Sequence, residues 1–132
     1  MKKPSKEFKK FVRETLQEYT GIVGYRHYTV DILYMKEDKD RDGDFVGGEI
    51  EINPTYLRCD VSIFPVLERM YNDGEKERVK ETLVHEMCHL ITEPLYRIAI
   101  DYHNNKNIHP DTLEEIREQQ TERIKNALLD FK

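Results

Sequence analysis

Residues 82–89 read TLVHEMCH, and this stretch contains the motif H-E-x-x-H in the form of His85, Glu86 and His89. Apolar residues recur around it at helical spacing and predict an amphipathic helix with one buried face: Val79, Leu83, Met87 and Leu90. Because four residues make about one helical turn, both imidazoles project from the same face and can bind one Zn²⁺. Glu86 lies one step round the helix, where it can take a proton from water that the zinc activates. The stretch therefore predicts a zinc site suited to hydrolysis.

An inert helix is the alternative, because two histidines can fall at this spacing by chance. Such a match is expected about once in 50 sequences with this content of His and Glu. The apolar face of the predicted helix favours the metal site, since a helix that presents ligands must itself be held rigidly.

The hydrophobic periodicity on either side of the motif predicts an α+β fold. Residues 5–19 show helical spacing, and three runs alternate as half-buried strands: 26–34, 45–52 and 56–63. Short connections, among them a charged turn at 36–44, predict an antiparallel three-stranded meander. After a helical turn near 66–70, the motif helix is expected to run from about residue 75 to residue 91 and to end before Pro94. A short helix at 95–102 and a last helix opened by His109 and Pro110 complete the prediction.

Residues 85–90 (HEMCHL), with Pro94, Leu95 and Tyr96 after them, resemble the active-site helix of small zincin-like metallopeptidases. Members of this group are often phage-encoded, and a proline ends their active-site helix soon after the second histidine. The order of predicted elements is similar too, so the resemblance covers most of the chain, with the motif as its specific part. It implies a minimal zincin fold, one zinc ion per chain, and hydrolysis of peptide bonds in a peptide or protein substrate.

The same resemblance implies a third metal ligand. In gluzincin-type members a glutamate on the downstream helix completes the site, often in a Glu-Gln pair, and residues 118–124 (EQQTERI) match this pattern. Glu118 is therefore expected to join His85 and His89, which gives the three protein ligands and open fourth position of a catalytic zinc. Because Glu118 falls away from the centre of the apolar stripe on its helix, other candidates stay open: Glu114, Glu115, Glu122, His103 and His109.

A second resemblance is to the SprT-like proteases, which act on protein bound to nucleic acid. Their active-site helices also read much like Thr-Leu-x-His-Glu-Met-Cys-His, but their third ligand is a later histidine, usually beside glycine. Here Asn104 follows His103 and Pro110 follows His109, so that pattern is absent. A non-catalytic protein whose zinc only stabilises the zincin fold is a further alternative. The residue that stabilises the oxyanion stays open among three candidates: Tyr96, Tyr102 and His103.

Residues 38–49 contain a second metal-binding pattern. They satisfy D-x-D-x-D-G-x5-E, the calcium loop of an EF-hand, with four carboxylates: Asp38, Asp40, Asp42 and Glu49. The flanking sequence reads as strands instead of the two helices of that motif, so a solvated acidic hairpin turn is expected. A hairpin that binds Ca²⁺ weakly, and with it a calcium-responsive binding module, is the alternative.

Length and composition predict one domain over residues 1–132, because a chain of this size can bury enough apolar surface to fold without stabilising cross-links. The formal charge of −5 leaves no basic excess for phosphates, so no nucleic-acid partner is expected. No stretch approaches the roughly 20 apolar residues of a membrane span, and no secretory signal is evident, which predicts a cytoplasmic protein without a membrane partner. Cys59 and Cys88 are expected to be free thiols, because two cysteines are too few for a disulfide framework.

Overall fold

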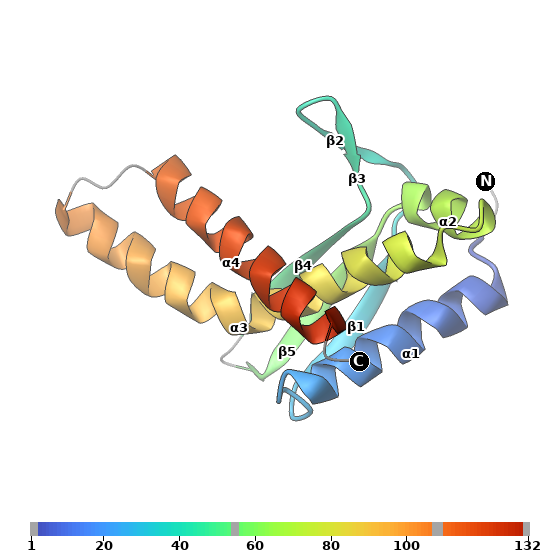
Figure 1. The fold of residues 1–132 in the computed structure, drawn as a ribbon, viewed down its shortest axis with the longest axis horizontal. Helices are drawn as coiled ribbons and strands as arrows, with labels where there is room; N and C mark the ends of the chain where they lie inside the picture. Colours follow the sequence, from blue (N-terminus) through green and yellow to red (C-terminus); the bar gives the residue numbers. More distant parts are fainter. Residues whose placement is uncertain (1–2, 54–55, 107–109, 131–132) are drawn as a thin grey trace.

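The computed structural model describes residues 3–53, 56–106 and 110–130, and Figure 1 shows them as helices packed on a small sheet. The helices are α1 (Lys6–Ile22), α2 (Pro65–Asn72), α3 (Lys76–Lys106) and α4 (Pro110–Asp130). The strands are β1 (Thr29–Tyr34), β2 (Lys39–Arg41), β3 (Asp44–Val46), β4 (Gly48–Asn53) and β5 (Arg58–Ile63). The predicted α+β class is confirmed. Among these described helices, none has the length and apolar character needed to cross a membrane.

Helix α1 forms where the periodicity predicts it and covers one side of the core. Ser5 caps it by accepting the backbone N–H of Phe8 at 3.2 Å, which satisfies a donor that the first helical turn leaves unpaired. The buried apolar stripe of α1 comprises Phe8, Val12, Leu16 and Tyr19. Helix α3 contributes Val79, Leu83, Val84, Met87 and Leu90 to the same core. The motif helix is therefore anchored along one face, as rigid presentation of ligands requires.

The main sheet has the strand order β1, β5, β4, so β5 is its central strand. β4 pairs with β5 in the antiparallel sense, as predicted, but β1 pairs with β5 in parallel, with Ile32 opposite Val61. The predicted antiparallel meander is therefore wrong. Alternation of side chains does not encode strand direction, because a strand buries the same residues whichever way its neighbour runs.

The predicted charged turn is a second, two-stranded sheet. β2 and β3 pair with each other and project from the body as an arm (Figure 1). Asp42 and Gly43 form its tip with positive φ angles of 54° and 89°, as a two-residue hairpin turn requires. The predicted strand over 45–52 is interrupted at Gly47, where an added Cβ would lie 3.0 Å from Leu67 Cδ1 and 3.1 Å from Thr82 Cγ2. This close approach sets the start of β4 against α2 and α3.

Helix α3 runs through Pro94, so the predicted end of the motif helix before that residue is wrong. The predicted short helix at 95–102 is the continuation of α3. Proline in a helix interior removes one backbone hydrogen bond and costs about 3 kcal/mol. Helix α4 runs back along α3 in the opposite direction (Figure 1), and the packing between the two helices offsets this cost. The pairing brings α4 back to the motif.

Candidate metal centre

The two motif histidines on α3 face a glutamate of α4. His85 Nε2 lies 3.1 Å from Glu118 Oε2, and His89 Nε2 lies 3.5 Å from Glu118 Oε1. Ligand atoms bound to a tetrahedral zinc at about 2.0 to 2.1 Å are about 3.4 Å from one another. Both observed distances are close to that spacing, and the Glu118 carboxylate thus meets each imidazole through a different oxygen.

Glu118 reaches the histidines because α4 turns a polar side toward α3. Thr121 and Lys125 are buried on this helix, at 0% and 8% exposure, whereas Ile116 of the apolar stripe is 47% exposed. At 3.6 residues per turn, positions 118, 121 and 125 lie within about 60° of one another. Thr121 and Lys125 extend the buried face of α4 from the apolar stripe toward Glu118, so the offset of Glu118 from that stripe does not keep it away from the motif.

A carboxylate holds the ring of His85 from its other side. The Nδ1–H of His85 donates to Glu122 Oε1, and Lys125 Nζ lies 2.9 Å from Glu122 Oε2. In the neutral ring, this hydrogen bond puts the proton of His85 on Nδ1 and the lone pair on Nε2. Metal-ligating histidines almost always donate their second N–H in this way. Glu122, one of the alternative third ligands, is thus placed as a partner of His85.

Two buried threonines play the same part for His89. Thr121 Oγ1 donates to the carbonyl of Arg117 at 2.8 Å. His89 Nδ1 lies 3.3 Å from Thr121 Oγ1 and 3.5 Å from Thr92 Oγ1, and the two hydroxyl oxygens are 2.8 Å apart. Because the Thr121 proton is committed to the carbonyl, the ring nitrogen is the donor toward Thr121. The network therefore favours the tautomer of His89 with its N–H on Nδ1 and its lone pair on Nε2.

Glu86 lies beneath these ligands with an orphaned oxygen. The side chain is 7% exposed, and its buried Oε2 atom has no hydrogen-bond partner among the described residues. One donor atom each from His85, Glu86 and His89 lie within 4.8 Å of one another, a group that can hold a metal ion. A buried carboxylate oxygen needs a partner, so the orphan is evidence that a cation or a water belongs in front of it.

Burial and neighbouring charges set the protonation of the site. Burial lowers the pKa of His89 to about 4, which keeps the ring neutral near pH 7. Burial raises the pKa of Glu86 to about 8, while the nearby His85 opposes the rise. Burial would also lower the pKa of His85, but hydrogen bonds to Glu118 and Glu122 and the charges of Glu86 and Glu118 reverse the shift and raise it. A cation at this point would favour the charged form of Glu86, since the ion is then the largest local charge.

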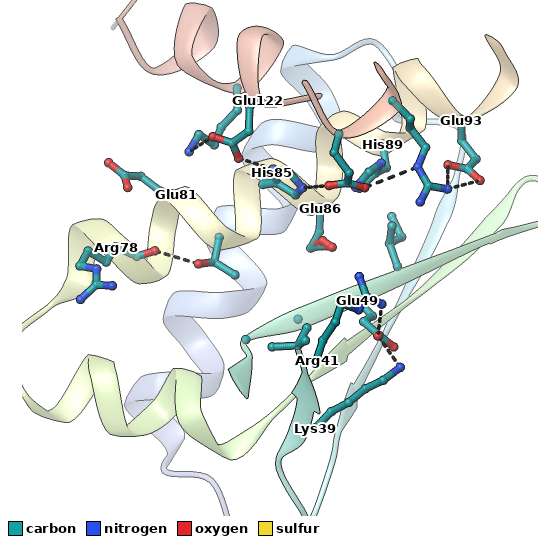
Figure 2. A pocket seen from close by; sticks show the side chains of 18 of the residues that line it. Lys39, Arg41, Glu49, Arg78, Glu81, His85, Glu86, His89, Glu93 and Glu122 are labelled. Atoms are coloured by element: carbon teal, nitrogen blue, oxygen red, sulfur yellow. Dashed lines mark hydrogen bonds and ion pairs between the residues drawn. The ribbon is translucent and has the colours of Figure 1, made fainter. Parts of the chain in front are cut away.

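The candidate ligands line one wall of an open pocket of about 720 Å³, shown in Figure 2. β4 and the arm form the facing wall. The Arg117 guanidinium lies over the ring of Tyr96, 4.2 Å from its centroid, and contacts Glu93 and Glu118 at 3.4 Å each. Tyr96, a candidate for oxyanion stabilisation, is therefore packed against Arg117. Of the other two candidates, Tyr102 is 54% exposed and the His103 side chain lies outside the described part.

The remaining alternative ligands do not meet the histidines where the structure describes them. Glu114 lies 3.5 Å from Arg117, and Glu115 accepts a hydrogen bond from Gln119 at 3.3 Å. The side chains of His103 and His109 lie outside the described residues. Sequence reasoning missed two residues that shape the site, Thr92 and Arg117, and it took Thr121 only as a sign of a polar side on α4. The helical spacing of 118, 121, 122 and 125 is the signal that marks this polar, site-facing side of α4.

The calcium-loop pattern folds as the acidic hairpin that the flanking strands predict. Asp38 accepts the backbone N–H of Val66 at 2.7 Å and pairs with Arg69 at 2.6 Å. Asp40 accepts the N–H of Gly43 at 3.0 Å. Glu49, the last residue of the pattern, contacts two cations of β2. The carboxylates are therefore engaged separately instead of converging on one point.

Comparisons of the chain with protein-family models, with curated proteins and with solved structures found no match.

Proposed function

We propose that this protein is a zinc-dependent metallopeptidase that hydrolyses peptide bonds. One observation carries the proposal: the Nε2 atoms of His85 and His89 converge on the Glu118 carboxylate beside the buried, orphaned carboxylate of Glu86. Two imidazoles and one carboxylate are a donor set that zinc accepts, and they leave a fourth position open. Zinc, when bound there, would polarise the substrate carbonyl and lower the pKa of the attacking water.

Glu86 is the general base in this proposal. Its carboxylate takes one proton from the water as the water attacks the carbonyl carbon, and then delivers that proton to the leaving amine nitrogen. His85 and His89 do not exchange protons, because their Nδ1–H groups are held by Glu122 and by Thr121. Their task is to present Nε2 in a fixed direction.

The outer edge of β4 at Gly48 and Ile50 supports an extended peptide as the substrate, whereas the carbonyl of Ile52 further along accepts a hydrogen bond from Arg97 at 3.0 Å. β4 is an edge strand, and Phe64 N–H donates to the carbonyl of Gly47 at 3.0 Å. With the observed register, alternate residues after Gly47 pair with β5, so Gly48 and Ile50 direct their backbone groups away from it. An extended chain can add there by main-chain hydrogen bonds. Gly48 adjoins the base, since an added Cβ would lie 3.6 Å from Glu86 Cγ.

The test compares wild-type protein with Glu86→Gln and with Glu115→Gln, a matched change on the same chain that lies away from the histidines. Elemental analysis measures zinc, and mass spectrometry measures cleavage of a mixed peptide library. We expect zinc in all three proteins and at least about a hundredfold loss of cleavage in Glu86→Gln alone, the size of a general-base contribution. Absence of zinc from the wild type, or unchanged cleavage by Glu86→Gln, would overturn the proposal.

A structural zinc is the second candidate, favoured by the fact that the donors join α3 to α4. A metal bound between the two helices would cross-link α4 to α3 and so stabilise the fold. In that case removal of the metal by a chelator would release α4, and the zinc-loaded wild type would cut no peptide.

A further inference from the structure

The arm places two cations at the rim of the pocket. Lys39 and Arg41 alternate along β2 and both contact the same oxygen of Glu49 on β4: Lys39 Nζ at 2.5 Å and Arg41 Nη2 at 3.2 Å. All three side chains line the pocket that holds Glu86, and Figure 2 shows them on the wall that faces it. The cations are thus held opposite the proposed base.

The two ends of the arm hold these cations in position: the end that joins the body of the protein and the tip. Where the arm joins the body, Asp38 accepts a hydrogen bond from the backbone N–H of Val66 and forms an ion pair with Arg69, and both partners are on α2. At its tip, Asp40 accepts the N–H of Gly43 at 3.0 Å and closes the turn. The arm therefore presents Lys39 and Arg41 from a tethered hairpin.

The charges on this wall do not cancel. Two cations share one carboxylate, whereas Lys125 on the opposite wall is matched by Glu122, and Arg117 contacts several carboxylates: Glu93, Glu114 and Glu118. The side chains of Lys39 and Arg41 are 46% and 58% exposed, so a ligand in the pocket can reach them. An ammonium has three donors and a guanidinium five, and Glu49 engages only part of that capacity.

We propose that Lys39 and Arg41 select substrates that carry a carboxylate close to the scissile bond. The inference rests on the proposed function and names its substrate class: peptides with an aspartate or glutamate side chain, or a free C-terminal carboxylate, near the cleavage point. Glu49 lies between Gly48 and Ile50, whose backbone groups point away from β5. A peptide paired along that edge passes directly beside the two cations. Its carboxylate shares them with Glu49 by charge-assisted hydrogen bonds.

The experiment uses zinc-loaded protein and synthetic peptides that differ only in Asp, Lys or Ala at the positions around the cleaved bond, each with a free or an amidated C-terminus. We expect acidic peptides to be cleaved at least about fivefold better than their lysine counterparts, the size of one partly exposed charge pair. Arg41→Glu should reverse that preference. Glu49→Gln should increase it, because the two cations lose their internal carboxylate. Lys36→Glu, an exposed position outside the pocket, is the charge-matched control and should leave the preference unchanged.

The two sources of the carboxylate separate cleanly. A preference that survives amidation belongs to a side chain, and one that disappears on amidation belongs to the C-terminus; either supports the inference. An equal rate for acidic and basic peptides, or a preference that Arg41→Glu leaves intact, would overturn it while the proposed function stands. If Glu86→Gln cleaves as well as wild type, Glu86 is not the general base. Binding of the same peptides to zinc-loaded Glu86→Gln then tests the inference by itself. Binding without a preference for acidic peptides would overturn it.

Discussion

Replacement of Thr121 by valine isolates the hydrogen bond that orients His89. Thr121 is fully buried, and valine has nearly the same shape, so the change removes a hydroxyl without opening a cavity. His89 Nδ1–H then loses its partner at 3.3 Å and keeps only Thr92 Oγ1 at 3.5 Å, the outer limit of a hydrogen bond. Because the position of Thr121 is closed to solvent, water cannot take the place of the missing hydroxyl.

The expected loss follows from this geometry. Removal of an outer-shell partner of a metal ligand lowers metal affinity by about 10 to 100 times, or about 1.4 to 2.7 kcal/mol. Because Thr92 retains a weak contact, we expect a loss near the lower end for Thr121→Val and a larger loss when Thr92→Val is added. The zinc-free protein should lose about 1 to 2 kcal/mol of unfolding free energy, since the hydrogen bonds to Thr92 and to the Arg117 carbonyl disappear.

A chelator competition titration measures the zinc dissociation constant, and urea unfolding measures stability. Thr121→Ser is the matched control: it keeps the hydroxyl and removes a buried methyl, so it should lose about 1 kcal/mol of stability and retain zinc affinity within about twofold. The two variants thus separate hydrogen bonding from packing. Equal zinc affinity in Thr121→Val and wild type would refute the argument that the threonine pair orients His89.

Two further predictions test the ligand set and the core. Glu118→Gln should weaken zinc binding by about a hundredfold or more in the same titration, because it removes the only charged ligand, whereas Glu115→Gln should bind zinc like wild type; equal affinities would move the third ligand elsewhere. Burial raises the pKa of the Cys59 thiol to about 11 and that of Cys88 to about 12, so at pH 8 about 0.1% or less of either thiol is ionised and a thiol reagent should label both only as fast as the protein unfolds. Rapid labelling of the native protein would contradict the buried positions of the two cysteines.

Local patterns in the chain were sufficient to predict the motif helix, α1 and the strand segments. His85 and His89 share a face because residues four apart always do so on a helix, and no distant contact is needed to place them together. The alternation at 56–63 likewise predicts which side chains of β5 are buried, since Cys59, Val61 and Ile63 are all in the core. Features of this kind depend on residues that are neighbours in sequence.

The two wrong predictions of the fold concern contacts between segments that are distant in the sequence. The parallel pairing of β1 with β5 depends on which strands meet, and strand alternation is the same for either direction. The continuation of α3 through Pro94 depends on α4 packing beside it, a contact that outweighs the local penalty of proline. Both features depend on the packing energy of contacts with segments that are far away along the chain.

The candidate site divides along the same line. The sequence by itself determined that two imidazoles and a carboxylate lie on one helical turn, and family resemblance supplied Glu118. Only the tertiary structure brought Glu118 to within 3.1 Å of His85, set Thr121 behind His89, and held Lys39 and Arg41 across the pocket. The reason is physical: spacing within a helix is fixed by the backbone, whereas the approach of a second helix or a hairpin is decided by the packing of the whole core.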